Sequence, residues 1–134
     1  MAVERTFVMV KPDGVAAGLV GEVIARLERK GLTMERITMV TIDEPLARTH
    51  YAEHVDKPFF PDLMKFITSG PVVASEWSGE SAVAVVRTLV GATDPRQAAP
   101  GTIRGDLAIE VTTNIVHASD SPESALRELG IFFG

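Results

Sequence analysis

One histidine of this 134-residue chain stands where chemistry is expected, at the junction between a strand and a helix. In "NIVHASDS" (114–121), His117 follows an apolar run and precedes a polar turn that opens a helix. A side chain at the end of a strand is exposed, and the free N–H groups of the next helix attract negative charge. A neutral imidazole is a nucleophile that can carry a phosphoryl group covalently. His117 is therefore a candidate for phosphoryl transfer, with a simple hydrogen bond to the turn as the alternative.

Three cations lie where folding alone gives little reason for a positive charge. Lys11 follows the first predicted strand, Arg87 stands near the end of an apolar helix, and Arg104 lies in a long loop. Surface solvation would explain any one of them. Together they suit an anionic group in transfer, because phosphoryl transfer depends mainly on positioning and on positive charge around the equatorial oxygens.

The segment "HYAEH" (50–54) permits a different chemistry. It fits the inverted zincin pattern H-x-x-E-H, in which His50 and His54 would ligate zinc and Glu53 would activate water. A zinc peptidase also needs a third ligand and a substrate cleft, and no other glutamate stands in a recognisable ligand context. We therefore favour two histidines on a solvated helix face, or a role without metal, over a peptidase.

The composition excludes several other classes. The chain has no cysteine, so disulfides, thiolate metal sites and a cysteine nucleophile are ruled out. P-loop, G-x-G-x-x-G, kinase catalytic-loop and G-x-S-x-G motifs are absent. The net charge of −5 argues against partners that are nucleic acids or anionic membranes. Without a signal peptide or an apolar run of about 20 residues, a cytoplasmic protein is expected.

The hydrophobic pattern predicts four strands with helices between them. Strands are expected at 6–10, 32–42, 72–77 and 114–118, and helices at 20–30, 43–55, 62–68, 81–90 and from about 122. Helix caps are predicted at Gly31, at Asp43, and at Asp120 or Ser121. Residues 11–18 and 91–106 are predicted loops. The order indicates a single α+β domain over residues 1–134, a ferredoxin-like split βαβ sandwich whose four-stranded antiparallel sheet carries helices on one face.

Five segments resemble, in order, those of nucleoside diphosphate kinases. They are "KPDGV" (11–15), "YAEHVDKPFFPDL" (51–63), "SGPVVA" (69–74), "GATDPRQAAPGTIRGD" (91–106) and "NIVHASDS". The likeness covers essentially the whole chain, and five motifs in register are far more specific than one. It implies a ping-pong kinase in which His117 takes the γ-phosphoryl group of a nucleoside triphosphate and gives it to a nucleoside diphosphate. A non-catalytic nucleotide-binding regulatory oligomer is the alternative.

The resemblance also implies the cofactor and the assembly. Mg²⁺ would be bound through the nucleotide phosphates, which agrees with the lack of a paired-carboxylate motif. The family forms hexamers or tetramers, and a hexamer is favoured here. The apolar fraction of 46% independently suggests that a partner subunit covers part of the surface.

Each site residue takes its expected role from the resemblance. Lys11 and Asn114 match the positions that contact the sugar hydroxyls, and Lys11 also approaches the phosphates. Phosphate contacts match His54, Arg87, Thr93 and Arg104. The base clamp matches a stacking aromatic with two apolar neighbours, namely Phe59, Leu63 and Val111. Three further residues match positions around the phosphoryl group. Tyr51 matches a hydroxyl near that group, and Glu128 matches the carboxylate that bonds the other nitrogen of His117. Ser119 matches a neighbouring hydrogen-bonding residue.

A few positions depart from the family's pattern without removing a chemical group from the proposed site. They are Ala16, Ala17, Leu107, Thr112, Thr113 and Ala118. Ala118 replaces the glycine that usually follows the histidine, so the backbone there is predicted to have an ordinary negative φ.

Overall fold

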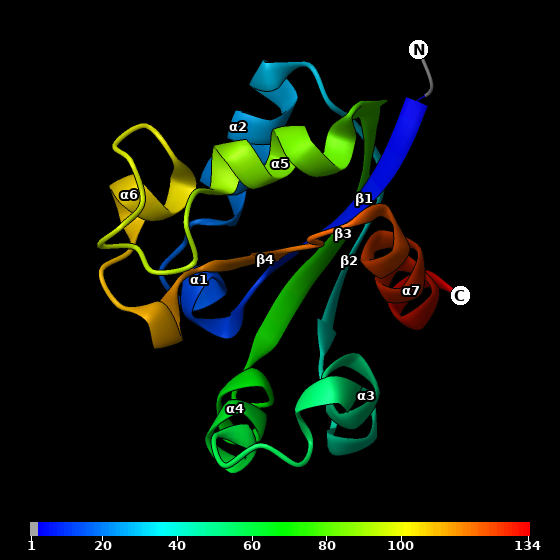
Figure 1. The fold of residues 1–134 in the computed structure, drawn as a ribbon, viewed down its shortest axis with the longest axis vertical. Helices are drawn as coiled ribbons and strands as arrows, with labels where there is room; N and C mark the ends of the chain where they lie inside the picture. The colour runs from blue at the N-terminus through cyan, green and yellow to red at the C-terminus, as the bar shows by residue number, and fades with distance from the viewer. Residues whose placement is uncertain (1–2) are drawn as a thin grey trace.

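The computed structural model describes residues 3–134 and contains one four-stranded sheet in the order β2-β3-β1-β4 (Figure 1). The strands are β1 (Val3–Val10), β2 (Thr33–Thr41), β3 (Pro71–Glu80) and β4 (Val116–Ala118). Every neighbouring pair is antiparallel, and β1 lies between β3 and β4. The predicted ferredoxin-like α+β fold is confirmed.

The described part of the chain also contains seven α-helices and two single-turn 3-10 helices, of which α7 follows the last strand and the others connect strands. The α-helices are α1 (Pro12–Ala16), α2 (Val20–Lys30), α3 (Glu44–His50), α4 (Phe60–Ile67), α5 (Ala82–Val90), α6 (Ile103–Leu107) and α7 (Pro122–Phe133). The 3-10 helices are η1 (Ala52–His54) and η2 (Val111–Thr113). Within residues 3–134, none of these helices is both long enough and apolar enough to cross a membrane.

Helices cover both faces of the sheet, and the alternation of side chains along β1 shows why. Val8 and Val10 point into a core formed with α2 and α5, whereas Phe7 and Met9 point into a second core with α3, α4 and α7. In Figure 1, α2 and α5 lie side by side on one side of the sheet. The prediction that the first strand is covered on each side is therefore confirmed, and the expectation of helices on one face only is wrong.

Local capping explains why several helix boundaries were predictable. Gly31 ends α2 in the left-handed conformation, with φ of 107°. The Asp43 carboxylate accepts a hydrogen bond of 2.9 Å from the Leu46 N–H at the start of α3. At the start of α7, the Ser121 hydroxyl accepts a 3.1 Å bond from the Ser124 N–H, so Ser121, rather than Asp120, is the cap.

Three helical segments differ from the predictions. α1 and α6 occupy segments predicted to be loops, and the helix predicted over 43–55 ends at His50. α1 depends on tertiary packing, because a Cβ at Gly14 would lie 2.8 Å from Val10 Cγ1 and 2.9 Å from the Ile115 carbonyl oxygen. Only glycine lets α1 approach the chain ahead of β4 so closely.

Candidate active site

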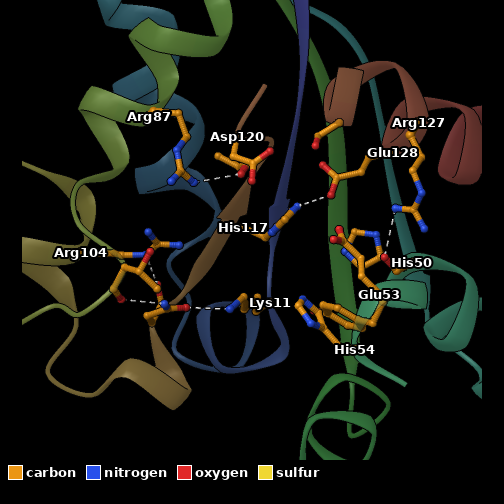
Figure 2. Close-up of a pocket in the computed structure, with 15 residues that line it drawn as sticks. Lys11, His50, Glu53, His54, Arg87, Arg104, His117, Asp120, Arg127 and Glu128 are labelled. Atoms are coloured by element: carbon orange, nitrogen blue, oxygen red, sulfur yellow. Dashed lines mark hydrogen bonds and ion pairs between the residues drawn. The ribbon is translucent and has the colours of Figure 1, made fainter. Parts of the chain in front are cut away.

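His117 is the central residue of β4, and its ring is fixed by a carboxylate on α7. It pairs with Met9 of β1, and its Nε2 lies 2.8 Å from Glu128 Oε2 (Figure 2). The other carboxylate oxygen of Glu128 accepts a 2.5 Å hydrogen bond from the Ser119 hydroxyl. Strand, turn and final helix are thus tied together at one carboxylate, which sets the direction of the imidazole.

The ionisation of Glu128 determines which nitrogen of His117 is free. Burial raises the pKa of Glu128, but hydrogen bonding and charge from His117, together with the Ser119 hydroxyl, outweigh burial and hold the pKa below its ordinary value. Glu128 is therefore an ionised acceptor, and His117 Nε2 must carry the hydrogen. In the neutral ring this leaves the lone pair on Nδ1, so Nδ1 is the nitrogen available for a nucleophilic role.

Lys11, Arg87 and Arg104 supply positive charge to the same cavity. Its volume is about 300 Å³, and its lining includes these three side chains and His117 (Figure 2). Between residues 3 and 134, the ion pairs of the structure use other cations, while these three donate to amide and carbonyl oxygens. Their charges are not neutralised by a carboxylate partner, so the cavity suits an anion.

Lys11 is placed by the end of β1 and by Asn114. Its Nζ donates a 2.7 Å hydrogen bond to Asn114 Oδ1, and Asn114 Nδ2 donates to the Thr93 carbonyl at 3.0 Å. Burial and the nearby Arg104 lower the pKa of Lys11 to about 8, although Asp13 opposes them. A bound phosphate would favour the charged form of this lysine.

Arg104 is a buried guanidinium whose position on α6 holds the segment before β4. Only 3% of the residue is exposed, and it donates to the carbonyl oxygens of Asn114, Gly91 and Val116 at 3.3, 3.1 and 2.6 Å. Burial, reinforced by the charge of Arg87, lowers its pKa to about 10. The planar guanidinium therefore both contributes charge and fixes the backbone that leads to His117.

The residue ahead of β4 has an unusual backbone. Ile115 has φ of 75°, which is strained for a β-branched side chain. Asp13 Oδ2 accepts a 3.0 Å bond from the Ile115 N–H, and the Lys11 N–H donates a 2.8 Å bond to the Ile115 carbonyl. The strained turn is thus anchored to the loop and helix that also carry Lys11. Ala118 has no positive φ, as its ordinary side chain predicted.

The family of the chain follows from its similarity to known proteins. The sequence model described as nucleoside diphosphate kinase matches residues 4–134. The nucleoside diphosphate kinase of Archaeoglobus fulgidus is 64% identical over 130 residues, which cover 97% of this chain and 86% of that protein. The chain belongs to the nucleoside diphosphate kinase family. The enzyme of the same name from Frankia casuarinae is 59% identical over 133 residues, covering 99% of this chain and 97% of that protein.

Solved structures of the family have the same fold. A halophilic nucleoside diphosphate kinase from Halobacterium salinarum in complex with CDP superposes with a TM-score of 0.95 at 54% identity, covering 98% of this chain and 88% of that one. The apo nucleoside diphosphate kinase of Encephalitozoon cuniculi gives a TM-score of 0.95 at 39% identity, covering 98% and 89%.

The structure gathers most of the predicted site residues of this family member around the cavity. Those in its lining are Lys11, Tyr51, His54, Arg87, Thr93, Arg104, Asn114, His117 and Glu128. Ser119 joins them through Glu128. Phe59, Leu63 and Val111 are outside the lining; Phe59 is half exposed and its ring lies 5.6 Å from that of His54. Burial, aided by the charge of Glu128, raises the pKa of Tyr51, so its hydroxyl remains a donor.

Six further lining residues were not among the predicted site residues. They are His50, Glu53, Ala118, Asp120, Ser124 and Arg127. His50 was expected on a solvated helix face, and that expectation is wrong because His50 is buried. Its spacing from the buried Ala47, three residues earlier on α3, was the sequence signal for an inward-facing position. The sequence pattern named Glu53 only within the zincin motif, Asp120 only as a possible helix cap and Ala118 only as a departure from the family. It does not single out Ser124 or Arg127.

The geometry of "HYAEH" gives no support to a zincin. α3 ends at His50, and His54 lies in the separate turn η1, so the two histidines are not on one continuous helix. Within residues 3–134, the one cluster of three or more histidine, aspartate and glutamate groups close enough to share a metal ion is His50, His117 and Glu128. It contains neither Glu53 nor His54.

Proposed function

We propose that this chain transfers the γ-phosphoryl group of a nucleoside triphosphate to a nucleoside diphosphate through a phosphohistidine on His117. The observation that carries the proposal is the 2.8 Å hydrogen bond from His117 Nε2 to Glu128, since it leaves Nδ1 free in a cavity lined by cations. Family membership supplies the reaction class. The residue roles come from the family resemblance, and the gathering of nine of these residues in the cavity lining supports them.

In the first half-reaction, the Nδ1 lone pair attacks the γ-phosphorus. The bond from that phosphorus to the bridging oxygen breaks, and the nucleoside diphosphate leaves with the electron pair. The ring gains positive charge as the N–P bond forms, and the ionised Glu128 stabilises it through Nε2–H. Lys11, Arg87 and Arg104 balance the charge of the transferring group, and His54 and Thr93 line the same cavity.

The second half-reaction reverses the first with another nucleotide. A terminal oxygen of a nucleoside diphosphate attacks the phosphohistidine, the N–P bond breaks, and its electrons return to Nδ1. Because donor and acceptor bind in turn at one site, no arrangement for two nucleotides is needed.

Nucleotide recognition beyond the phosphates would use two residues of the cavity lining and three residues outside it. Lys11 and Asn114, joined by their hydrogen bond, would contact the sugar hydroxyls. Phe59 would stack on the base, with Leu63 and Val111 as apolar neighbours, and Tyr51 would donate near the phosphoryl group. A stacking contact accepts every base, since each presents a π-face. We therefore expect broad nucleotide specificity.

Mg²⁺ would enter as part of the substrate, on the nucleotide phosphates. Mg²⁺ prefers six oxygen ligands, whereas the one candidate metal cluster among the described residues offers two imidazoles and a single carboxylate. Glu53 and Asp120 line the cavity, where their carboxylates can hold water on such an ion. The protein fits a magnesium–nucleotide complex better than a resident magnesium ion.

We also propose a homo-oligomer, a hexamer rather than a tetramer, acting in the cytoplasm. The edge strand β2 supports a partner contact, because it presents exposed apolar side chains at Ile37 and Met39. Analytical ultracentrifugation distinguishes six subunits from four.

Phosphoryl labelling tests the function. Incubation with γ-labelled triphosphate should give an acid-labile, alkali-stable phosphoprotein that a nucleoside diphosphate discharges, and His117→Ala should abolish the label. A folded wild-type protein that binds nucleotide but never becomes labelled would instead support the non-catalytic binding protein.

A further inference from the structure

His50 is a buried histidine for which the proposed reaction has no use. It ends α3, is 4% exposed, and packs against Phe7 and Phe132 with ring-centroid distances of 6.2 and 5.4 Å. Neither of its ring nitrogens has a hydrogen-bond partner in the described structure. Buried polar atoms are normally paired, so both nitrogens of this cavity-lining ring are available to bind a ligand.

The unpaired ring faces the proposed nucleophile. The His50 and His117 rings meet edge to face with centroids 5.1 Å apart, and both residues line the cavity together with Glu128 (Figure 2). One ligand atom from each of His50, His117 and Glu128 lies within 4.8 Å of the others. The three groups come from α3, β4 and α7, so tertiary structure alone brings them together.

The attachment of α3 to α7 holds this arrangement. Arg127 of α7 donates to the carbonyl oxygen of His50 at 3.2 Å and to that of Thr49. Burial, followed by the charge of His117, lowers the pKa of His50 to about 3. The His50 ring is therefore neutral at physiological pH and keeps the lone pair that a metal requires.

We infer that His50, His117 and Glu128 form a binding site for Zn²⁺, and that zinc bound there prevents phosphorylation of His117. Two imidazoles and one carboxylate are a donor set that zinc accepts, with water as the fourth ligand. In tetrahedral zinc the ligand atoms are about 3.4 Å apart. The His117–Glu128 pair, at 2.8 Å, must open by about 0.6 Å, and His50, whose ligand atom lies within 4.8 Å of the other two, must approach by at most about 1.4 Å.

Zinc would disable the nucleophile whichever nitrogen of His117 it takes. If it binds Nδ1, it occupies the lone pair that attacks phosphorus. If it binds Nε2, the ring hydrogen moves to Nδ1 and the same lone pair is lost. The inhibition rests on the proposed role of His117, whereas the metal binding depends only on the three side chains.

Zinc binding is measured directly on the purified chain, without nucleotide, by calorimetry with ZnCl₂ alone. We expect one zinc ion per chain. The three histidines of the sequence allow a complete set of variants. His50→Phe, which keeps a ring against Phe7 and Phe132, and His117→Ala should each weaken binding at least tenfold. His54→Asn, the matched control, should leave the zinc affinity unchanged. Absence of stoichiometric binding, or the same affinity after His50→Phe, would overturn the site.

A measurement on the wild-type protein removes any dependence on how the variants fold. In ¹H–¹⁵N NMR spectra of the imidazoles, one equivalent of Zn²⁺ should shift the ring signals of His50 and His117 and leave those of His54 in place. Shifts confined to His54, or no shifts at all, would contradict the proposal.

Labelling then tests the consequence separately. Protein preloaded with one equivalent of Zn²⁺ should lose at least nine tenths of its γ-phosphoryl labelling, and a chelator should restore it. Zinc binding at His50 and His117 with undiminished labelling would overturn the inhibition. A metal-free protein that never labels would refute the proposed function while leaving the zinc site standing.

Discussion

The imidazole of His117 and the carboxylate of Glu128 share a 2.8 Å hydrogen bond that joins the last strand to the last helix. The bond assigns opposite tasks to the two ring nitrogens, because Nε2 donates to an ionised carboxylate and Nδ1 keeps its lone pair. The same carboxylate accepts from Ser119, so its position is fixed from two sides. Orientation of the ring and stabilisation of its charge thus come from a single side chain.

Replacing Glu128 by glutamine tests this double role. Glu128→Gln keeps the shape but removes the charge that stabilises the phosphorylated ring. A charge-assisted hydrogen bond contributes about 1.5–3 kcal/mol, so we expect kcat to fall by roughly 10- to 100-fold. Rapid-quench measurement of phosphohistidine formation checks the effect. Glu123→Gln, on the exposed face of the same helix, is the control and should keep wild-type rates. Equal rates in both variants would refute the role of Glu128.

The parts of the fold that could be predicted, above all the helix ends, depend mostly on residues close together in the sequence. Gly31, Asp43 and Ser121 act within one turn of their own position, so their caps are readable from neighbouring residues. α1 was missed because its stability comes from Gly14 packing against Ile115, about 100 positions later in the chain. A short helix of this kind has no periodic pattern of its own.

The candidate site was predictable only through the family resemblance. Lys11 and Asn114 are 103 positions apart and still share a 2.7 Å hydrogen bond, which no spacing rule indicates. His50 shows the limit of motif reading. Its place in "HYAEH" suggested a solvated face, whereas the packing of α3 against the sheet and α7 buries it beside His117. Its meaning depends on tertiary contacts.

We expect Lys11 to be required for phosphoryl transfer while lowering the free energy of unfolding. Its folded pKa of about 8 lies below the ordinary 10.5, so the folded state disfavours the charged form. Below pH 8 this destabilisation is fully present. Between about pH 8 and 10.5 the unfolded chain still holds a proton that the folded state has lost, so stability rises with pH and the destabilisation disappears. Lys11→Met should therefore raise the free energy of unfolding by about 1–2 kcal/mol at pH 7 while nearly abolishing transfer.

Urea denaturation of wild type and Lys11→Met at several pH values measures that difference. The increase in the free energy of unfolding of Lys11→Met over wild type should shrink steadily between pH 8 and 10.5. A gain that stays constant, or grows with pH, would show that burial of the charged lysine is not its cause.

Even a conservative substitution of Arg104 should destabilise the fold. Its fork donates to three backbone carbonyls, which a lysine ammonium cannot reach together. Arg104→Lys leaves at least one buried carbonyl unpaired, and we expect a loss of about 2–4 kcal/mol in the free energy of unfolding. Thermal denaturation checks this. Arg96→Lys, which affects only an exposed ion pair with Asp94, should change stability by less than about 0.5 kcal/mol. Comparable losses in both would contradict the structural role of Arg104.

Phe59 offers a test of base stacking that is separate from the fold. Its side chain is 50% exposed, so Phe59→Ala should cost little stability. Stacking contributes about 1–3 kcal/mol per base, and its loss should raise KM by roughly 5- to 100-fold while kcat stays within about twofold. Because a π-face is common to all bases, the increase should be similar for purine and pyrimidine diphosphates. Leu126→Ala removes an exposed apolar side chain that is not among the predicted site residues and does not line the cavity, and it should leave KM unchanged. If Phe59→Ala lowers kcat with KM unaltered, the ring acts on the transferring group or on His54 beside it, and the stacking role is wrong.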